Sequence, residues 1–171
     1  KWCSIIVAAS LLATQVFAVS FSDIGDYDWA RDAITNLSEK NIIVGIGGDL
    51  FAPQESVTRE QLAKMLVLAF DLQTDEEAQG SFSDVGEDRW SFAYIEAAKE
   101  LFDLEGVFEP ESPASRLEVA MAVAKAVTEG ENLWTDSDAW TKFSDLDGLT
   151  DEEKAWVSAA VEMELIEGFP D

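Results

Sequence analysis

The sequence contains no histidine, and its single cysteine, Cys3, lies in an N-terminal segment that we expect to be removed. These absences exclude zinc sites made of Cys and His, thiol nucleophiles, disulfides and His-based catalytic triads. An enzyme would have to use carboxylates, Lys, Tyr, Ser or Thr. With 35 Asp and Glu residues some carboxylate pair is always close, so a glycosidase has no specific signal here. We predict no catalytic activity, no cofactor and no metal.

Basic residues are scarce: 11 Lys and Arg stand against 35 Asp and Glu, which gives a formal net charge of -24 at pH 7. Nucleic acids and anionic lipid head groups bind clustered Lys and Arg, so both are excluded as partners. The simplest interpretation is that this negative charge keeps the protein soluble. The hydrophobic content of 47% and the aromatic content of 11% still predict a packed core rather than disorder.

Long apolar runs are also missing, apart from a short one near the N-terminus. Residues 1–18 have the pattern of a secretory signal peptide: Lys1 supplies charge, Ile5 to Leu12 are mostly apolar, and Val16-Phe17-Ala18 resembles a cleavage site. The apolar run is too short to span a bilayer comfortably, although a retained anchor is the alternative. We therefore expect a secreted chain with no membrane span after signal removal.

Two motifs recur along the chain. Phe21-Ser22-Asp23 returns at equal spacing as Phe82-Ser83-Asp84 and Phe143-Ser144-Asp145, and Thr58-Arg59-Glu60-Gln61 returns as Ser115-Arg116-Leu117-Glu118. A repeat of this length predicts small modules stacked on one another. We define unit 1 as residues 21–73, unit 2 as 82–128 and unit 3 as 143–171. Unit 3 lacks the second motif, so we expect this sequence to stop inside a repeat.

Each complete unit is predicted to be a helix, a loop and a second helix, because its apolar residues recur at helical spacing. The Thr58/Gln61 and Ser115/Glu118 pairs have the spacing of capping boxes that start the second helices. The first helices are indicated by Ala30 to Ile43, Ala93 to Leu104 and Ala155 to Ile166. The buried faces of the second helices are predicted to hold Leu62, Met65, Leu66 and Ala69, and then Val119, Ala120, Val123 and Val127.

Arg59 and Arg116 each follow directly on a predicted helix N-cap. A cation at this position opposes the helix dipole, so it is a poor choice for stability alone. It suits the binding of an anion, since free backbone N–H groups and a guanidinium would point the same way. The alternative is an ion pair with a local carboxylate such as Asp49 or Glu111. Because the arginine recurs at equivalent positions, we favour the anionic ligand.

Other candidate residues have a structural and a functional interpretation. Trp29 and Trp90 could stack on a sugar, but large aromatic residues at helical spacing are usually core residues, and we favour that. Gly45 could let a ligand approach the backbone, or could serve a turn with positive φ. Asp145-x-Asp147-Gly148 hints at calcium but lacks the remaining ligands, so solvated turn carboxylates are favoured.

In these motifs the chain resembles the S-layer homology family, whose region normally holds three tandem repeats. Family repeats open with Phe-x-Asp and Trp-Ala, then carry a helix, a glycine loop ending in Phe-x-Pro, and a Thr-Arg-Ala-Glu motif. Unit 1 supplies Phe21-x-Asp23, Trp29-Ala30, Gly45, Phe51-x-Pro53 and Thr58-Arg59-Glu60; unit 2 supplies Phe82-x-Asp84, Trp90, Phe108-x-Pro110 and Ser115-Arg116-x-Glu118.

The resemblance implies an all-α fold in which tandem helix-loop-helix repeats pack as a pseudo-threefold prism around a central helical bundle. It implies non-covalent anchoring to the bacterial cell wall through a secondary cell-wall polysaccharide or a peptidoglycan-linked glycan, often pyruvylated, with a fused cargo domain downstream. The expected ligand-binding residues are Arg59, Arg116, Trp29, Trp90, Gly45, Thr58 and Ser115. The alternatives are a self-assembling surface lattice, and the anchor of a wall-active hydrolase whose catalytic domain lies elsewhere.

Overall fold

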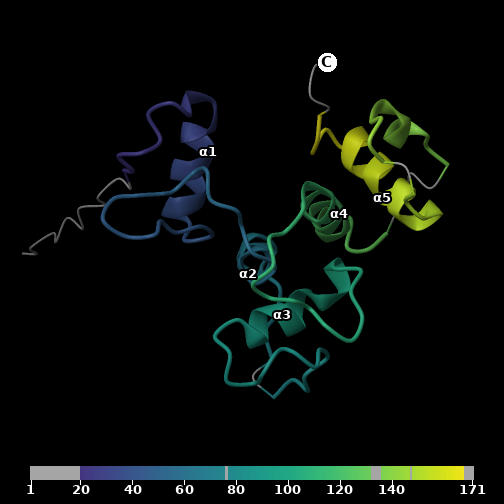
Figure 1. Ribbon diagram of the computed structural model, residues 1–171, viewed down its shortest axis with the longest axis horizontal. Helices are drawn as coiled ribbons and strands as arrows, with labels where there is room; N and C mark the ends of the chain where they lie inside the picture. The colour runs from purple at the N-terminus through teal and green to yellow at the C-terminus, as the bar shows by residue number, and fades with distance from the viewer. Residues whose placement is uncertain (1–19, 76, 132–135, 147, 168–171) are drawn as a thin grey trace, which may run out of the picture.

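The structure is a computed structural model that describes residues 20–75, 77–131, 136–146 and 148–167 (Figure 1). The predicted signal peptide, Trp134, Asp147 and residues 168–171 lie outside these ranges. Within them the chain forms α-helices, short 3-10 helices and loops, and no strand, which confirms the all-α prediction. No helix in the described ranges is both long and apolar enough to cross a membrane.

Unit 1 contains α1 (Asp28–Glu39) and α2 (Arg59–Phe70). Helix α1 ends before Ile43 because Asn41 adopts a left-handed conformation with φ of 56°, which an α-helix cannot include. Helix α2 begins at the predicted capping box: Thr58 Oγ1 accepts from the Gln61 N–H, and the Gln61 side chain accepts from the Thr58 N–H. Its buried residues include Leu62, Ala63, Leu66 and Val67, whereas Ala69 is exposed, contrary to prediction.

Unit 2 contains α3 (Phe92–Ala98) and α4 (Arg116–Val127), and α3 continues into the 3-10 helix η1 (Lys99–Leu101). The predicted Ser115/Glu118 capping box is present at the start of α4. Val127 is exposed, contrary to prediction, while Met121, Ala122 and Ala124 are buried.

In unit 3, α5 (Asp151–Glu162) follows the 3-10 helix η2 (Ala139–Lys142) and ends before the predicted Ile166. It starts with a third capping box, formed by Thr150 and Glu153, which is not among the predicted ones.

The helices pair across unit boundaries. Helix α2 of unit 1 packs on α3 of unit 2, and α4 of unit 2 packs on α5 of unit 3, while α2 also contacts α4. One buried cluster joins α2 and α3, with Phe82, Phe102 and Phe108 among its members. A second joins α4 and α5 through residues such as Met121 and Trp156. Each pair therefore combines the second helix of one unit with the first helix of the next.

Helix α1 takes part in none of the extensive helix–helix contacts between the described elements, and Figure 1 shows it at one side of the molecule. Ile34 and Ser38 of this helix are buried, whereas Trp29 exposes 87% of its surface. The observed pairing concerns α2 to α5, and the pseudo-threefold prism stays a prediction.

The Phe-Ser-Asp motif fastens the start of a unit to its own loop. In unit 2 the N–H and Oγ of Ser83 both donate to the Gly106 carbonyl, at 2.8 and 2.9 Å. The Asp84 carboxylate accepts from the N–H groups of Phe108 and Glu109, at 2.8 and 2.7 Å. The rings of Phe82 and Phe108 lie 5.1 Å apart. The motif therefore makes contacts with residues far along the chain.

Unit 1 closes in the same way. The Asp23 carboxylate accepts from the N–H groups of Phe51 and Ala52, at 2.9 and 2.7 Å. The Phe21 and Phe51 rings lie 5.2 Å apart. In both units this closure fixes the loop that precedes the second helix and its arginine.

Candidate functional site

The start of α2 sits against the loop of unit 2, and we call this contact the seam: residues 57–61 against residues 108–115 and the first turn of α4. Backbone hydrogen bonds join its two sides. The Arg59 N–H donates to the Ser112 carbonyl and the Glu60 N–H to the Pro110 carbonyl, both at 3.0 Å. The next N–H, of Gln61, donates to the Thr58 side chain. The expectation of free N–H groups for an anion is therefore wrong at α2.

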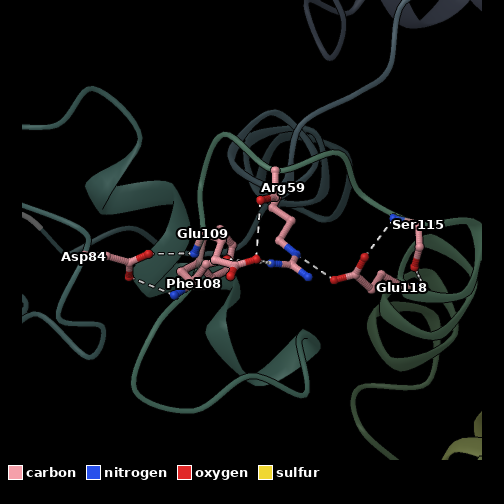
Figure 2. Close-up of polar contacts among 7 residues, drawn as sticks. Arg59, Asp84, Phe108, Glu109, Ser115 and Glu118 are labelled. Carbon is pink, nitrogen blue, oxygen red and sulfur yellow. Dashed lines mark hydrogen bonds and ion pairs between the residues drawn. The ribbon is translucent and has the colours of Figure 1, made fainter.

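Arg59 reaches across the seam between two carboxylates (Figure 2). Its Nε lies 2.7 Å from Glu118 Oε1, and its Nη1 lies 2.8 Å from Glu109 Oε2 and 3.2 Å from the Phe108 carbonyl. Only 16% of the arginine side chain is exposed. Burial disfavours the charged form, but the two carboxylates outweigh it and raise the pKa of Arg59. The predicted ion-pair alternative is thus present, with Glu109 and Glu118 in place of Asp49 or Glu111.

The two carboxylates are held very differently. Glu118 is 23% exposed and belongs to the α4 capping box, where it accepts from the Ser115 N–H at 2.7 Å. Burial raises the pKa of Glu118, but the hydrogen bonds from Ser115 and Arg59 outweigh it and lower the pKa below its usual value. Glu109 is 59% exposed and sits on the loop. Arg59 therefore has one partner built into a helix cap and one at the surface.

Arg89 forms a second ion-pair group near the seam. It binds Glu60 through Nε at 2.8 Å and Nη2 at 3.0 Å, and it contacts Glu111 at 2.9 Å. Glu60 is buried and also accepts from Ser91 Oγ at 2.6 Å. Burial raises the pKa of Glu60, but these donors outweigh it and lower the pKa. Sequence reasoning missed Arg89 because unit 1 has no arginine at the matching place, so the repeat did not mark it.

Arg116 occupies the equivalent position in the next unit. Its Nη2 donates to the Glu167 carbonyl at 2.6 Å, much as Arg59 donates to the Phe108 carbonyl. A cavity of about 140 Å³ adjoins it, lined mainly by apolar side chains that include Leu117 and Phe143. Both repeated arginines therefore reach from the start of a second helix into the following unit.

The two tryptophans are exposed, so the favoured core interpretation is wrong for both. Trp29 is 87% and Trp90 is 54% exposed. Trp90 lies beside α2, with Lys64 Nζ at 5.9 Å from its ring and the Tyr94 ring at 6.4 Å. Stacking on a sugar stays a prediction for both residues.

Gly45 is required by close packing inside its own loop. A Cβ at this position would lie 2.3 Å from the Leu50 carbonyl oxygen and 2.6 Å from the Phe21 ring. The positive-φ explanation is wrong for Gly45, although it holds for Gly47 and Gly48, whose φ values are 101° and 61°. The predicted approach of a ligand to Gly45 stays untested.

In the described ranges no group of three or more Asp, Glu or Cys side chains is arranged to hold a metal ion. Asp147 lies outside those ranges, so the sequence hint at Asp145-x-Asp147 is not tested.

Comparison with known proteins gives a consistent set of relatives. Residues 20–63 match the family model of the S-layer homology domain. The chain is 32% identical over 163 residues to an S-layer protein of Bacillus licheniformis, covering 88% of this chain and 18% of that protein. It is 28% identical over 156 residues to exoglucanase XynX of Acetivibrio thermocellus, covering 90% and 14%. It is 28% identical over 155 residues to an amylopullulanase of Thermoanaerobacterium thermosulfurigenes, covering 89% and 8%. The chain thus spans less than a fifth of each of these relatives.

Proposed function

This chain contains an S-layer homology region, and from that premise we propose that it anchors a secreted protein to the bacterial cell surface without a covalent bond. The proposed ligand is a secondary cell-wall polysaccharide or a peptidoglycan-linked glycan, with pyruvate ketals as the recognised groups.

The range of relatives supports an anchoring role over catalysis. Nearly the whole chain aligns with a small part of proteins whose names differ widely, from S-layer protein to exoglucanase and amylopullulanase. A segment shared by such different proteins is better explained by a common means of attachment than by a common reaction. The region is therefore proposed to be non-enzymatic, with its cargo elsewhere in the polypeptide.

The observation that carries the proposal is the repeated arginine at the contacts between units. Arg59 and Arg116 both donate to a loop carbonyl of the following unit, in a chain with very few basic residues. A guanidinium is a planar set of donors that matches a carboxylate, the charged group of a pyruvate ketal. We further propose that the ligand binds in grooves between neighbouring units, with Thr58 and Ser115 at their edges, and this placement of the arginines supports it.

We also propose the pseudo-threefold prism as the arrangement of the three units. The pairing of α2 with α3 and of α4 with α5 supports it, because the same step occurs twice. In the complete prism, the second helix of unit 3 would pack on α1 in the same way, near the exposed Trp29.

A pull-down on purified cell-wall sacculi tests the anchor. The double variant Arg59→Ala/Arg116→Ala should bind at least tenfold more weakly, because each arginine supplies charge-assisted hydrogen bonds worth about 1.5–3 kcal/mol. Arg59→Lys/Arg116→Lys keeps the charge but not the planar fork, and should lose most of the binding.

The matched control is Arg31→Ala/Lys40→Ala, which removes one positive charge from α1 and one from its C-cap and should bind within about twofold of wild type. Circular dichroism shows whether each variant is folded. Binding that survives removal of the secondary polysaccharide, or that is unchanged in the Arg59/Arg116 double variant, contradicts the proposal.

A surface-lattice module is the second candidate, favoured by the exposed Val44 and Ile46 in the loop that follows α1 and by the S-layer proteins among the relatives. Exposed large apolar side chains can contribute to surfaces that associate. Light scattering without glycan distinguishes this role: concentration-dependent assembly supports it, and a persistent monomer counts against it.

A further inference from the structure

Glu109 holds a backbone conformation that does not require its side chain. Its φ is 52°, and its N–H donates to Asp84 at 2.7 Å. At the matching place in unit 1, Ala52 has a φ of 61° and donates to Asp23, also at 2.7 Å. Alanine therefore makes the same turn. What the glutamate adds at this position is a carboxylate placed on Arg59.

The Glu109 carboxylate is the partner of Arg59 that can leave. Its Oε2 accepts from Arg59 Nη1 at 2.8 Å and from Ser112 Oγ at 3.3 Å, and most of the side chain is in solvent. The other partner, Glu118, cannot move away without breaking the α4 capping box. Rotation of Glu109 exposes the guanidinium edge while the helix and the loop stay in place.

The donors of Arg59 show where a ligand carboxylate would meet Glu109. Nε is used by Glu118, and Nη1 by Glu109 and the Phe108 carbonyl. Within the described part of the chain Nη2 makes no hydrogen bond. A carboxylate that binds the fork through both Nη1 and Nη2 must therefore share Nη1 with Glu109. Three carboxylates around one guanidinium would repel one another, so the ligand and Glu109 exclude each other.

We propose that Glu109 is an internal competitor for the glycan carboxylate at Arg59, and that it sets the affinity and selectivity of this site. The proposal rests on the anchoring function above. A neutral sugar gains no charge interaction when it displaces a paired carboxylate, so the glutamate favours ligands with a well-placed carboxylate over neutral sugars. It also lowers the affinity for the correct glycan by the strength of one partly exposed ion pair.

Titration calorimetry with purified wall polysaccharide tests this, using Glu109→Ala, the residue that unit 1 carries, and Glu109→Gln, which keeps the size. Both should bind about two- to fivefold more tightly than wild type, the range expected from removing an exposed ion pair that competes with the ligand. Polysaccharide treated with mild acid to remove pyruvate ketals should lose affinity for all three proteins, and it should lose less affinity for the two Glu109 variants than for wild type because the glutamate sets the selectivity. The matched control is Glu111→Gln, which removes a carboxylate two residues away that pairs with Arg89 and should leave the affinity unchanged.

Each outcome bears on a different claim. Equal or weaker binding by both folded Glu109 variants, or an equal gain in Glu111→Gln, overturns the competitor role while leaving the anchoring function in place. Binding by Glu109→Ala where wild type binds undetectably supports it. If neither wild type nor the Glu109 variants bind intact polysaccharide, the anchoring function and the competitor role are both wrong.

Discussion

In each of the first two units, one aspartate carboxylate ties the start of the unit to its loop. Asp23 and Asp84 each accept two backbone N–H groups from a loop more than twenty residues further along the chain. These N–H groups lower the pKa of Asp23, and they also lower that of Asp84, where they outweigh the opposing effect of burial. The ionised form of each carboxylate is therefore more stable in the folded chain than in the unfolded chain.

Asp84→Asn should lower the free energy of unfolding at pH 7 by about 1–3 kcal/mol, because two N–H groups beside the buried Phe108 lose a charged acceptor. The folded-state pKa of Asp84 lies below the ordinary value of 3.8 for an aspartate. Its contribution is therefore present above the unfolded pKa and is lost as the pH falls through the lower folded pKa.

Urea midpoints measured between pH 7 and pH 2.5 check this prediction. The stability of the variant should depend less on pH below about 4 than that of wild type. Asp32→Asn, an exposed position on α1, is the charge-matched control. Parallel pH curves for wild type and Asp84→Asn would contradict the role given to this carboxylate.

At the scale of helices, the capping boxes were the most informative local signal. The Thr58/Gln61 and Ser115/Glu118 boxes predict the starts of α2 and α4, and both are confirmed. The Thr150/Glu153 box has the same spacing but was missed. The first helices α1 and α3 have no side-chain cap, so units 1 and 2 gave no reason to look for one at α5.

Helix ends and buried faces were harder to predict because they depend on neighbours. Helix α2 packs against both α3 and α4. Ala63 and Val67 are therefore buried and Ala69 is exposed, whereas a single apolar face at helical spacing predicts otherwise. The ion pairs at the seam depend in the same way on loops from the next unit. Repetition therefore located Arg59 and Arg116, whereas only the assembled structure identified Arg89 and Glu109.

The Ser115 cap should be worth about 0.5–2 kcal/mol of stability, which Ser115→Ala would remove. Its loss leaves the Glu118 N–H without its side-chain acceptor and loosens the carboxylate that pairs with Arg59. Chemical denaturation measures the change, and Ser115→Thr serves as the control because it keeps the hydroxyl. Equal stability of the Ala and Thr variants would show that the cap contributes nothing.

The molecule as a whole carries a large excess of negative charge. The formal net charge is -24, and several of the few cations are already placed between carboxylates, as Arg59 and Arg89 are. Self-repulsion among the remaining carboxylates opposes the compact state, and it acts between exposed groups that salt screens well.

Salt should therefore stabilise the fold at pH 7. Raising the ionic strength from about 0.01 to 0.5 M shortens the screening length severalfold, so the thermal midpoint should rise by several degrees. Differential scanning calorimetry measures it, and sodium chloride and choline chloride should act alike if screening is the cause. A midpoint that falls with salt would mean that the seam ion pairs outweigh the general repulsion.

The pairing of helices between consecutive units has a consequence for dissecting or transplanting this region. The repeated sequence unit and the pair of helices that shares a core are offset from each other by one helix. Helix α2 shares its core with α3 of the next unit, and α4 shares its core with α5. Excision at the Phe-Ser-Asp boundaries splits both cores. Crossover points within the glycine and proline loops instead keep each helix pair together, so a shuffled or minimal version of this region is best cut there.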